Sequence, residues 1–301
     1  MANTIIYQAL WENKLAQRLD KPQNWKEVCD VVYSDTNAYN FPLISTSNEP
    51  AVTANQFASN ADRSDLTKVI PFISVTETNQ TLSIITTDID SVYIDYADQA
   101  QSNYAKIAEM GTLLGKKVGE RAETIILANH ANWTDFGDTG GGVLGLASTD
   151  ITVSATNVDD IVRGVIEQIY TANGFNLYKE NGGFIVWKPA HWTFMVQFMQ
   201  ANGFNLADQS LKSGGAIGID YLGLYHYVST SHAATNNVMA GVRKVQKFGI
   251  LRSTYGKTYV NEMPASSTAG SMSGTQIHTR LDYGLLVPTN MLAVIFDVNT
   301  T

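Results

Sequence analysis

Residues 97–130 have the sequence ADQAQSNYAKIAEMGTLLGKKVGERAETIILANH, which predicts the longest element of the protein. Apolar residues recur there at steps of three and four, the spacing of a helix with one buried face. At about 1.5 Å per residue, this helix would be roughly 50 Å long, which is unusual for a globular domain. The pattern is set by Ala100, Tyr104, Ile107, Leu114, Val118, Ala122 and Ile125.

Three glycines in this helix, Gly111, Gly115 and Gly119, are four residues apart and therefore share one face. Each costs roughly 1 kcal/mol relative to alanine in a helix interior. Two interpretations stay open: the glycines weaken the helix without a partner, or they form a groove that admits a strand or another helix. A membrane helix pair is not expected, because Lys116 and Lys117 lie between the glycines.

Two strand-like runs precede the helix, at residues 66–76 and 82–96, and both are rich in Ile, Val, Thr and Tyr. Residues 77–80 are predicted to be the turn of a hairpin between them, and the polar residues 46–64 an exposed loop. Pro71 makes the first run an expected edge strand. Because a lone hairpin is only marginally stable in water, this one is expected to need a partner surface.

Shorter helices and strands follow the long helix, so the sequence predicts an α+β fold. Glycine-rich residues 133–150 are expected to form a loop, followed by a helix with its cap at Thr156 or Asn157. Residues 184–187 predict a strand that leads into a second helix starting at Pro189.

The sequence ANGFNL occurs at residues 172–177 and again at 201–206, where each helical pattern stops. In both copies the glycine, Gly174 or Gly203, is the expected left-handed residue that ends a helix. The last third of the chain is rich in strand formers, and residues 291–296 predict a short buried strand.

The composition limits the classes of protein that need to be considered. The chain has 301 residues, 20 Lys and Arg against 28 Asp and Glu, and a net charge of −8. Only 16% of the residues are charged, which indicates that part of the surface faces other protein. An acidic chain is a poor candidate for sequence-specific DNA binding, which depends on basic patches.

Targeting signals and cysteine pairs are not expected either. Residues 1–19 predict an amphipathic helix rather than a signal peptide, and no apolar run is long enough for a membrane helix. Cys29 is the only cysteine, so no disulfide can form within the chain. It lies among valines and is expected to be a buried thiol in a protein made in a reducing cytoplasm.

Candidate catalytic and metal-binding residues are scattered along the chain. The loop at residues 137–142 is rich in glycine but lacks the Lys-Ser/Thr of a P-loop. Asp135 with Asp138 is one candidate pair for a hard cation. Ser231 and His232 are adjacent, so their side chains point in different directions and do not predict a catalytic triad. A second acidic group consists of Asp88, Asp90, Asp95 and Asp98.

The spacing of the histidines does not predict a zinc site. His130, His191, His226 and His278 are isolated and match no zinc motif. We therefore predict no active site, no cofactor and no metal, and we expect the protein not to be an enzyme.

The order of these parts resembles the major capsid protein of tailed bacteriophages, with the Hong Kong 97-type fold. The stretches that carry the resemblance are Asn40-Phe41-Pro42-Leu43-Ile44, Ser91-Val92-Tyr93-Ile94-Asp95-Tyr96-Ala97-Asp98 before the long helix, Phe184-Ile185-Val186-Trp187-Lys188-Pro189, and the run GGAIGIDYLGLYHYVSTSH at residues 214–232. The last resembles a strand pair in the central domain of the family.

This resemblance implies a division of the chain into an arm, an extended loop and two domains. The loop, called the E-loop, would lie over a neighbouring subunit, and the long helix would be the spine of a peripheral domain. An axial domain would meet the symmetry axes of a shell. The implied boundaries are residues 1–45 for the N-terminal arm, 46–92 for the E-loop hairpin, 93–139 and 239–301 for the peripheral domain with its spine helix at about 97–130, and 140–238 for the axial domain.

The same resemblance implies the partners. The chain would assemble with itself as pentamers and hexamers into an icosahedral head in the host cytoplasm, and the head would enclose double-stranded DNA without sequence specificity. Scaffold, portal and decoration proteins would be further partners, and no membrane would be involved. The inter-subunit contact candidates are Lys68, Ile70, Phe72, Asp88, Asp90, Gly111, Gly115, Gly119, Lys116 and Lys117.

The sequence also offers one candidate crosslinking residue and two alternative functions. Some relatives crosslink subunits through a Lys–Asn bond, and Lys68 is the only lysine in the implied E-loop, where an ordinary surface role is expected. The alternative function is a hydrolase or ligand-binding enzyme that uses the glycine-rich loop at residues 137–145. A third possibility is a tail-tube or decoration protein, although the long helix counts against that class.

Overall fold

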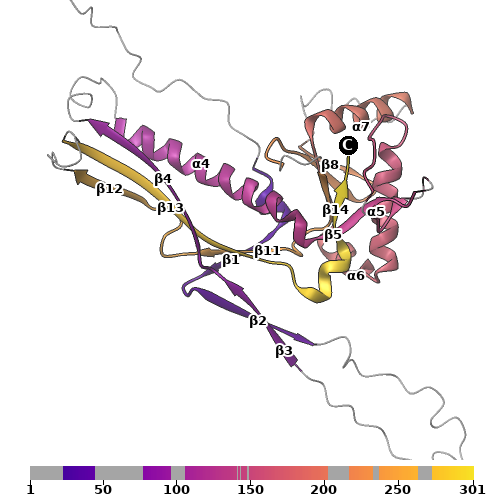
Figure 1. The fold of residues 1–301 in the computed structure, drawn as a ribbon, viewed down its shortest axis with the longest axis horizontal. Coiled ribbons are helices and arrows are strands. Elements are labelled where there is room, and N and C mark those ends of the chain that lie inside the picture. Colours follow the sequence, from indigo (N-terminus) through magenta and orange to yellow (C-terminus); the bar gives the residue numbers. More distant parts are fainter. Residues whose placement is uncertain are drawn as a thin grey trace, which may run out of the picture.

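The computed structural model describes residues 23–44, 77–95, 106–140, 142, 144–147, 149–202, 217–232, 237–263 and 273–301. Within them lie a seven-stranded sheet, a five-stranded sheet and a two-stranded ribbon, together with helices. This mixed architecture agrees with the predicted α+β class. Figure 1 shows an elongated body that contains the long helix, with a more compact α/β body at one of its ends.

The long helix is α4 (Lys106–Ala128), which continues into the short 3-10 helix η2 (Asn129–Asn132). Its predicted apolar face is confirmed over this range, because Leu114 and Ala122 are buried. The first part of the predicted helix, residues 97–105, lies outside the described residues.

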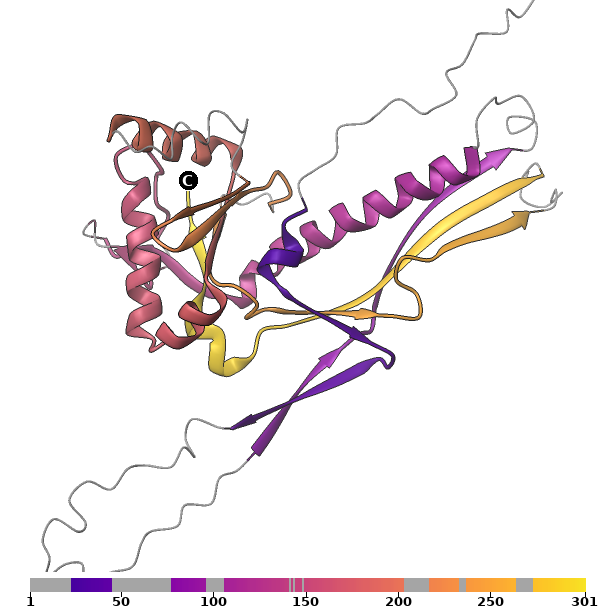
Figure 2. The ribbon, with the colours of Figure 1, turned by 180° about the vertical axis from the view of Figure 1, so that it is seen from behind.

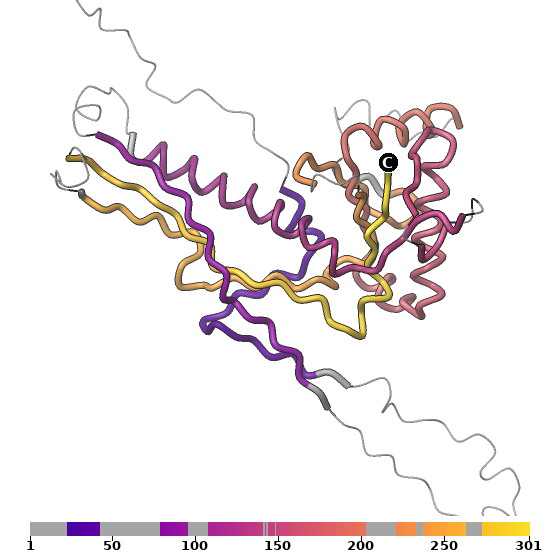
Figure 3. Tube along the Cα trace, in the orientation of Figure 1, coloured from indigo at the N-terminus to yellow at the C-terminus, as the bar shows by residue number. Residues whose placement is uncertain are grey.

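The five-stranded sheet runs beneath α4 along the elongated body (Figures 1 and 3). Its longest strand is β13 (Gly274–Leu286), which pairs antiparallel with β4 (Thr86–Asp95) along one side. On its other side β13 pairs with β12 (Thr258–Met263) and β11 (Lys247–Leu251). Strand β1 (Asp30–Ser34) adds to β11 in parallel and brings the N-terminal part of the chain into this sheet.

The predicted hairpin with its turn at residues 77–80 is wrong. Those residues belong to strand β3 (Glu77–Ser83), which pairs antiparallel with β2 (Ala38–Ile44) in a two-stranded ribbon. Most described residues of the ribbon are exposed, so no apolar alternation marks it in the sequence. The first predicted run, residues 66–76, lies outside the described residues.

The ribbon leaves the sheet at a close crossing of backbones. Leu82 and Ile84 are buried there, and a Cβ added at Gly249 would come within 2.7 Å of the Leu82 side chain. A Cβ at Gly284 would lie only 2.0 Å from the carbonyl oxygen of Ser83. Neither position has room for a side chain, so both residues at this crossing need to be glycine.

The α/β body is built on the seven-stranded sheet, whose strands lie in the order β6, β5, β14, β10, β7, β9, β8. Helices α5 and α6 lie on the face of this sheet away from α4, as both Figure 1 and Figure 2 show. The helices are α5 (Val158–Thr171), α6 (Phe175–Asn181) and α7 (Pro189–Ala201). The strands are β5 (Thr134–Asp138), β6 (Leu144–Gly145), β7 (Gly183–Trp187), β8 (Ile217–Tyr221), β9 (Leu224–Val228), β10 (Asn237–Val242) and β14 (Ile295–Asn299).

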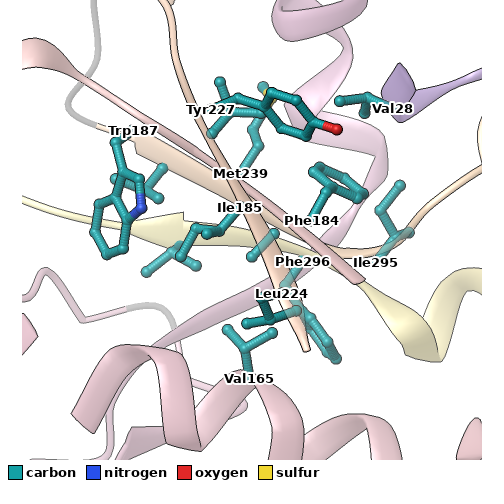
Figure 4. Close-up of a cluster of buried hydrophobic side chains, with 14 of the residues drawn as sticks. Val28, Val165, Phe184, Ile185, Trp187, Leu224, Tyr227, Met239, Ile295 and Phe296 are labelled. Carbon is teal, nitrogen blue, oxygen red and sulfur yellow. The ribbon is translucent and has the colours of Figure 1, made fainter. Parts of the chain in front are cut away.

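The core of this body centres on β7, in which every residue is buried. Figure 4 shows the side chains of Phe184, Ile185 and Trp187 among those of the neighbouring strands, with Val165 of α5 packed below Leu224. A strand covered on both faces carries a continuous apolar run, which is why residues 184–187 predict this strand correctly. Pro189 begins α7, as predicted.

Asn157 is the N-cap residue of α5, one of the two predicted positions, but the expected capping contact and the expected role of Gly174 are both wrong. The side chain of Asn157 makes no capping hydrogen bond to α5; its Oδ1 accepts the backbone N–H of Ser154 instead. At the end of α5, Asn173 takes the positive φ of 58°, while Gly174 has a φ of −78° and precedes α6. Asparagine tolerates this conformation, so the glycine is not needed for it.

The glycine-rich segment and the C-terminus also differ from the predictions. Part of the predicted loop at residues 133–150 forms the antiparallel pair β5–β6. The predicted strand at residues 291–296 is mostly the 3-10 helix η3 (Thr289–Val294), and β14 begins only at Ile295. Strands β10 and β14 both lie in the seven-stranded sheet, so the implied boundary between residues 238 and 239 does not follow the division into sheets.

Candidate functional site

The structure does not bring together the acids around the glycine-rich loop. Asp138 lies at the end of β5, and its Oδ1 accepts the backbone N–H groups of Gly140 and Gly142, each at 3.0 Å. Asp135 is three residues earlier on the strand and therefore points to the opposite face. The carboxylate of Asp138 thus holds its own loop, and this geometry gives no support to the alternative of an enzyme using residues 137–145.

Two acids of the second acidic group, Asp88 and Asp90, form ion pairs within the chain. Asp88 accepts a hydrogen bond from Arg121 Nε at 2.7 Å, and Asp90 forms an ion pair with Lys117 Nζ at 3.1 Å. These pairs join β4 to α4. Asp98 lies outside the described residues. Within the described ranges, no group of three or more His, Cys, Asp or Glu is arranged to hold a metal ion.

Ser231 and His232 do not form a catalytic pair. Ser231 is buried, and its hydroxyl makes no hydrogen bond with another described residue, so it is not bonded to the ring of His232. Burial, followed by the nearby charge of Lys188, lowers the pKa of His232 to about 4. A serine and a histidine that do not contact each other cannot activate a nucleophile in this arrangement.

Three other histidines lie beside aromatic side chains of the fold. His226 is fully buried, its Nδ1 accepts a hydrogen bond from Trp187 Nε1 at 2.9 Å, and burial lowers its pKa to about 3. His191 is buried beside Trp192 at the start of α7. His278 stacks on Tyr259, with ring centroids 5.0 Å apart.

Cys29 is a buried thiol, as predicted, and lies beside an unexpected buried acid. Burial raises the pKa of the Cys29 thiol, and the charges of Glu123 and Asp30 raise it further. The thiol is therefore protonated and shielded from solvent.

Glu123 is the acid that the sequence did not single out. It lies on α4 with only 2% of its surface exposed, and burial raises its pKa to about 7. Hydrogen bonds reach its carboxylate from Ser229, which follows β9, and from Asn24 and Trp25 at the start of α1 (Trp25–Val28). Glu123 therefore ties the long helix to the α/β body and to the N-terminal part of the chain.

An exposed apolar row follows β4 on the face of its sheet that is turned away from α4. Ile85, Ile89 and Tyr93 are 78%, 62% and 45% exposed, whereas Ile94 is buried beneath the helix. The alternation follows from the two-residue period of a strand. A sheet covered by a helix on one face only leaves its other face to solvent or to another protein.

The predicted contact candidates fall into three groups. Lys68, Ile70 and Phe72 lie outside the described residues. Asp88, Asp90 and Lys117 make the ion pairs between β4 and α4 described above. The remaining candidates, Gly111, Gly115, Lys116 and Gly119, lie on α4.

The three glycines of α4 have different surroundings. A Cβ at Gly111 would touch the side chain of Thr258 at 3.6 Å, and one at Gly119 would meet the side chain of Gln23 at 2.3 Å. A Cβ at Gly115 would find nothing within 4 Å. No continuous groove filled by another described element is therefore present within the subunit, and contact with a second subunit stays a prediction.

Comparison with solved structures identifies the fold. A structure described as Mycobacterium phage Che8 matches with a TM-score of 0.67 at 14% identity, over 99% of this chain and 98% of that chain. The capsid of an empty GTA particle matches with a TM-score of 0.63 at 14% identity, over 97% of this chain and 95% of that chain. The mature capsid of bacteriophage PhiM1 matches with a TM-score of 0.59 at 13% identity, over 98% and 92% of the two chains.

The fold is therefore that of bacteriophage capsid structures, and the predicted resemblance is confirmed at the level of the fold. No protein-family model and no curated protein matches the sequence. None of the helices that the structure describes is long and apolar enough to cross a membrane.

Proposed function

We propose that this chain is the major capsid protein of a tailed bacteriophage and has a structural rather than an enzymatic role. It assembles with itself as pentamers and hexamers into an icosahedral head around double-stranded DNA. The observation that carries this proposal is the match to capsid structures over nearly the whole of both chains. The exposed apolar row of Ile85, Ile89 and Tyr93 and the low share of charged residues are additional support, because shell subunits need extensive contacts.

We propose that the Hong Kong 97-type parts correspond to the following described elements. The β2–β3 ribbon is the base of the E-loop, α4 is the spine helix, and the elongated body is the peripheral domain. The α/β body is the axial domain. Because β5, β10 and β14 belong to the seven-stranded sheet, we assign them to the axial domain. The boundaries expected from the sequence put most of their residues in the peripheral domain.

A loop replacement tests the assembly role without disturbing the subunit core. Ile44 and Glu77 are paired residues at the end of the β2–β3 ribbon, so residues 45–76 can be replaced by Asn-Gly, which closes a two-residue hairpin. We expect the shortened chain to fold with the same circular dichroism per residue in the 200–240 nm range for helix and strand, but to form no shells. Shells of normal size from the shortened chain, seen by electron microscopy, would contradict the proposed role of the E-loop.

The outcome for DNA follows from charge. With a net charge of −8, the subunit is expected to bind DNA weakly and without sequence preference. Scaffold, portal and decoration proteins are proposed partners in the head, which would form in the host cytoplasm. Nanomolar, sequence-dependent binding at physiological salt in a fluorescence-anisotropy titration would contradict this part of the proposal.

A further inference from the structure

An acidic cavity lies beside strands β5, β14 and the start of β10 in the seven-stranded sheet. Its volume is about 570 Å³, and it opens between η2, the start of β10 and the C-terminal residues. Asp135, Asp150 and Asp297 all line it, together with His130 and the amides of Asn237 and Asn299. No lysine or arginine is among the lining residues.

Two oxygen atoms of residues in the cavity wall are buried and have no hydrogen-bond donor among the described residues. Asp297 is only 3% exposed; its Oδ2 accepts hydrogen bonds from Asn237 Nδ2 at 2.9 Å and contacts His130 Nδ1 at 2.8 Å. Its second oxygen, Oδ1, is buried without a hydrogen-bond partner among the described residues. The hydroxyl oxygen of Thr300, which is 2% exposed, is also buried without a partner. A buried acceptor left without a donor costs roughly 1–3 kcal/mol, so Asp297 is an incompletely satisfied acid in the wall of the cavity.

The residues that line the cavity carry more negative than positive charge. Burial raises the pKa of Asp297, and the charge of Asp135 on the adjacent strand raises it further, while His130 acts in the opposite direction. Asp135 and Asp150 are exposed at the mouth of the cavity. A ligand with positive charge and several N–H donors would balance the charge at this mouth, where the carboxylates of Asp135 and Asp150 are accessible acceptors.

We propose that this cavity receives an arginine or lysine side chain from a second copy of the chain. The inference rests on the proposed capsid function, which supplies the second copy. A metal ion is the less suitable occupant, because the carboxylates and histidine among the described residues are not arranged to hold one. A guanidinium or ammonium group brings its own donors and needs no such coordination geometry.

The chain offers suitable cations. Lys179, Lys244 and Lys257 are exposed and form no ion pair with a described residue. In a shell built from identical subunits, every acidic cavity meets a surface that carries the same lysines. Charge complementarity of this kind fixes the register and the association rate of subunits more than their total affinity.

The first test uses the folded chain and a small probe. We would titrate N-acetyl-arginine amide into the protein and follow the backbone amide of Thr300 by NMR, with the uncharged N-acetyl-citrulline amide as the matched probe. We expect binding of the arginine probe at least tenfold tighter than that of citrulline. The double variant Asp135→Asn with Asp150→Asn should remove this difference, whereas Glu167→Gln with Glu180→Gln, which removes two exposed acids on α5 and α6, should not.

The second test measures assembly. We expect the Asp135/Asp150 variant to keep the wild-type melting temperature but to need at least tenfold more protein to assemble, with weaker salt dependence than the Glu167/Glu180 variant. Equal responses to the two probes, or assembly equal to that of the control variant, would overturn the inference. Calcium chloride shifting Thr300 where the arginine probe does not would also overturn it, in favour of a metal site. If the wild-type chain forms no shells either alone or together with a phage scaffold protein, the proposed function fails, and the probe titration still decides whether the cavity binds a basic group.

Discussion

Replacing Glu123 by glutamine should change how the stability of the protein depends on pH. Glu123 is buried on α4, and burial raises its pKa from the usual glutamate value of about 4.5 to about 7. The native state therefore holds this proton more tightly than the unfolded state. The stabilisation is complete below about pH 4.5 and is lost as the pH rises through 7.

The size of the effect follows from this difference in pKa. It corresponds to about 3 kcal/mol of stability lost between pH 4.5 and a pH well above 7. Glutamine is neutral at every pH, and its oxygen can still accept the N–H groups of Asn24 and Trp25. We therefore expect Glu123→Gln to match the wild type near pH 5 and to exceed it at pH 8, by roughly 6–10 °C in melting temperature.

Differential scanning fluorimetry from pH 5 to 8 measures this directly. The informative quantity is the difference in melting temperature between variant and wild type at each pH, because other carboxylates titrate equally in both proteins. Glu167→Gln, which changes an exposed acid on α5, should show no trend. A difference that stays constant with pH for Glu123→Gln would show that burial does not hold this carboxyl protonated.

Three further substitutions probe packing and assembly. Gly115→Ala should stabilise the subunit by about 1 kcal/mol, since its Cβ meets nothing within 4 Å, and should weaken assembly if this face contacts a second subunit. Gly284→Ala should destabilise by about 1–3 kcal/mol or more in urea unfolding, because its Cβ would lie 2.0 Å from the Ser83 carbonyl oxygen. Phe184→Ala should cost about 3–5 kcal/mol in the same assay, whereas Phe175→Ala, at a 53% exposed site, should cost much less; similar losses would contradict the assigned core.

Local patterns in the sequence predicted the elements whose burial follows a simple pattern along the chain. α4 is amphipathic over its described length, so its apolar spacing predicted it. β7 is buried on both faces, and its continuous apolar run predicted it equally well. Pro189 at the start of α7 is a local signal of the same kind.

Elements that depend on distant partners were not predictable in this way. β3 is polar because the ribbon is exposed, so a turn was expected where a strand exists. β14 pairs in parallel with β5 and antiparallel with β10, and no local pattern shows that a C-terminal strand lies between two strands so far away in sequence. Long-range pairing of this kind overrides local propensity.

The candidate sites were also difficult to predict, because the residues that lie together in the fold come from distant parts of the sequence. Asp135 and Asp138 are close in sequence but lie on opposite faces of β5. The acidic cavity instead joins His130, Asn237 and Asp297, which only the tertiary structure brings together. Glu123 carried a weak signal in the sequence, since it is an acid within the apolar end of the long helix.

The central claim, that the chain builds a shell, is tested most directly by electron microscopy of the purified wild-type protein, alone and expressed together with a phage scaffold protein. We expect closed particles with pentameric and hexameric units, in which each subunit shows α4 and the α/β body. A compact monomer or dimer under both conditions, with no shells, tubes or sheets, would contradict it.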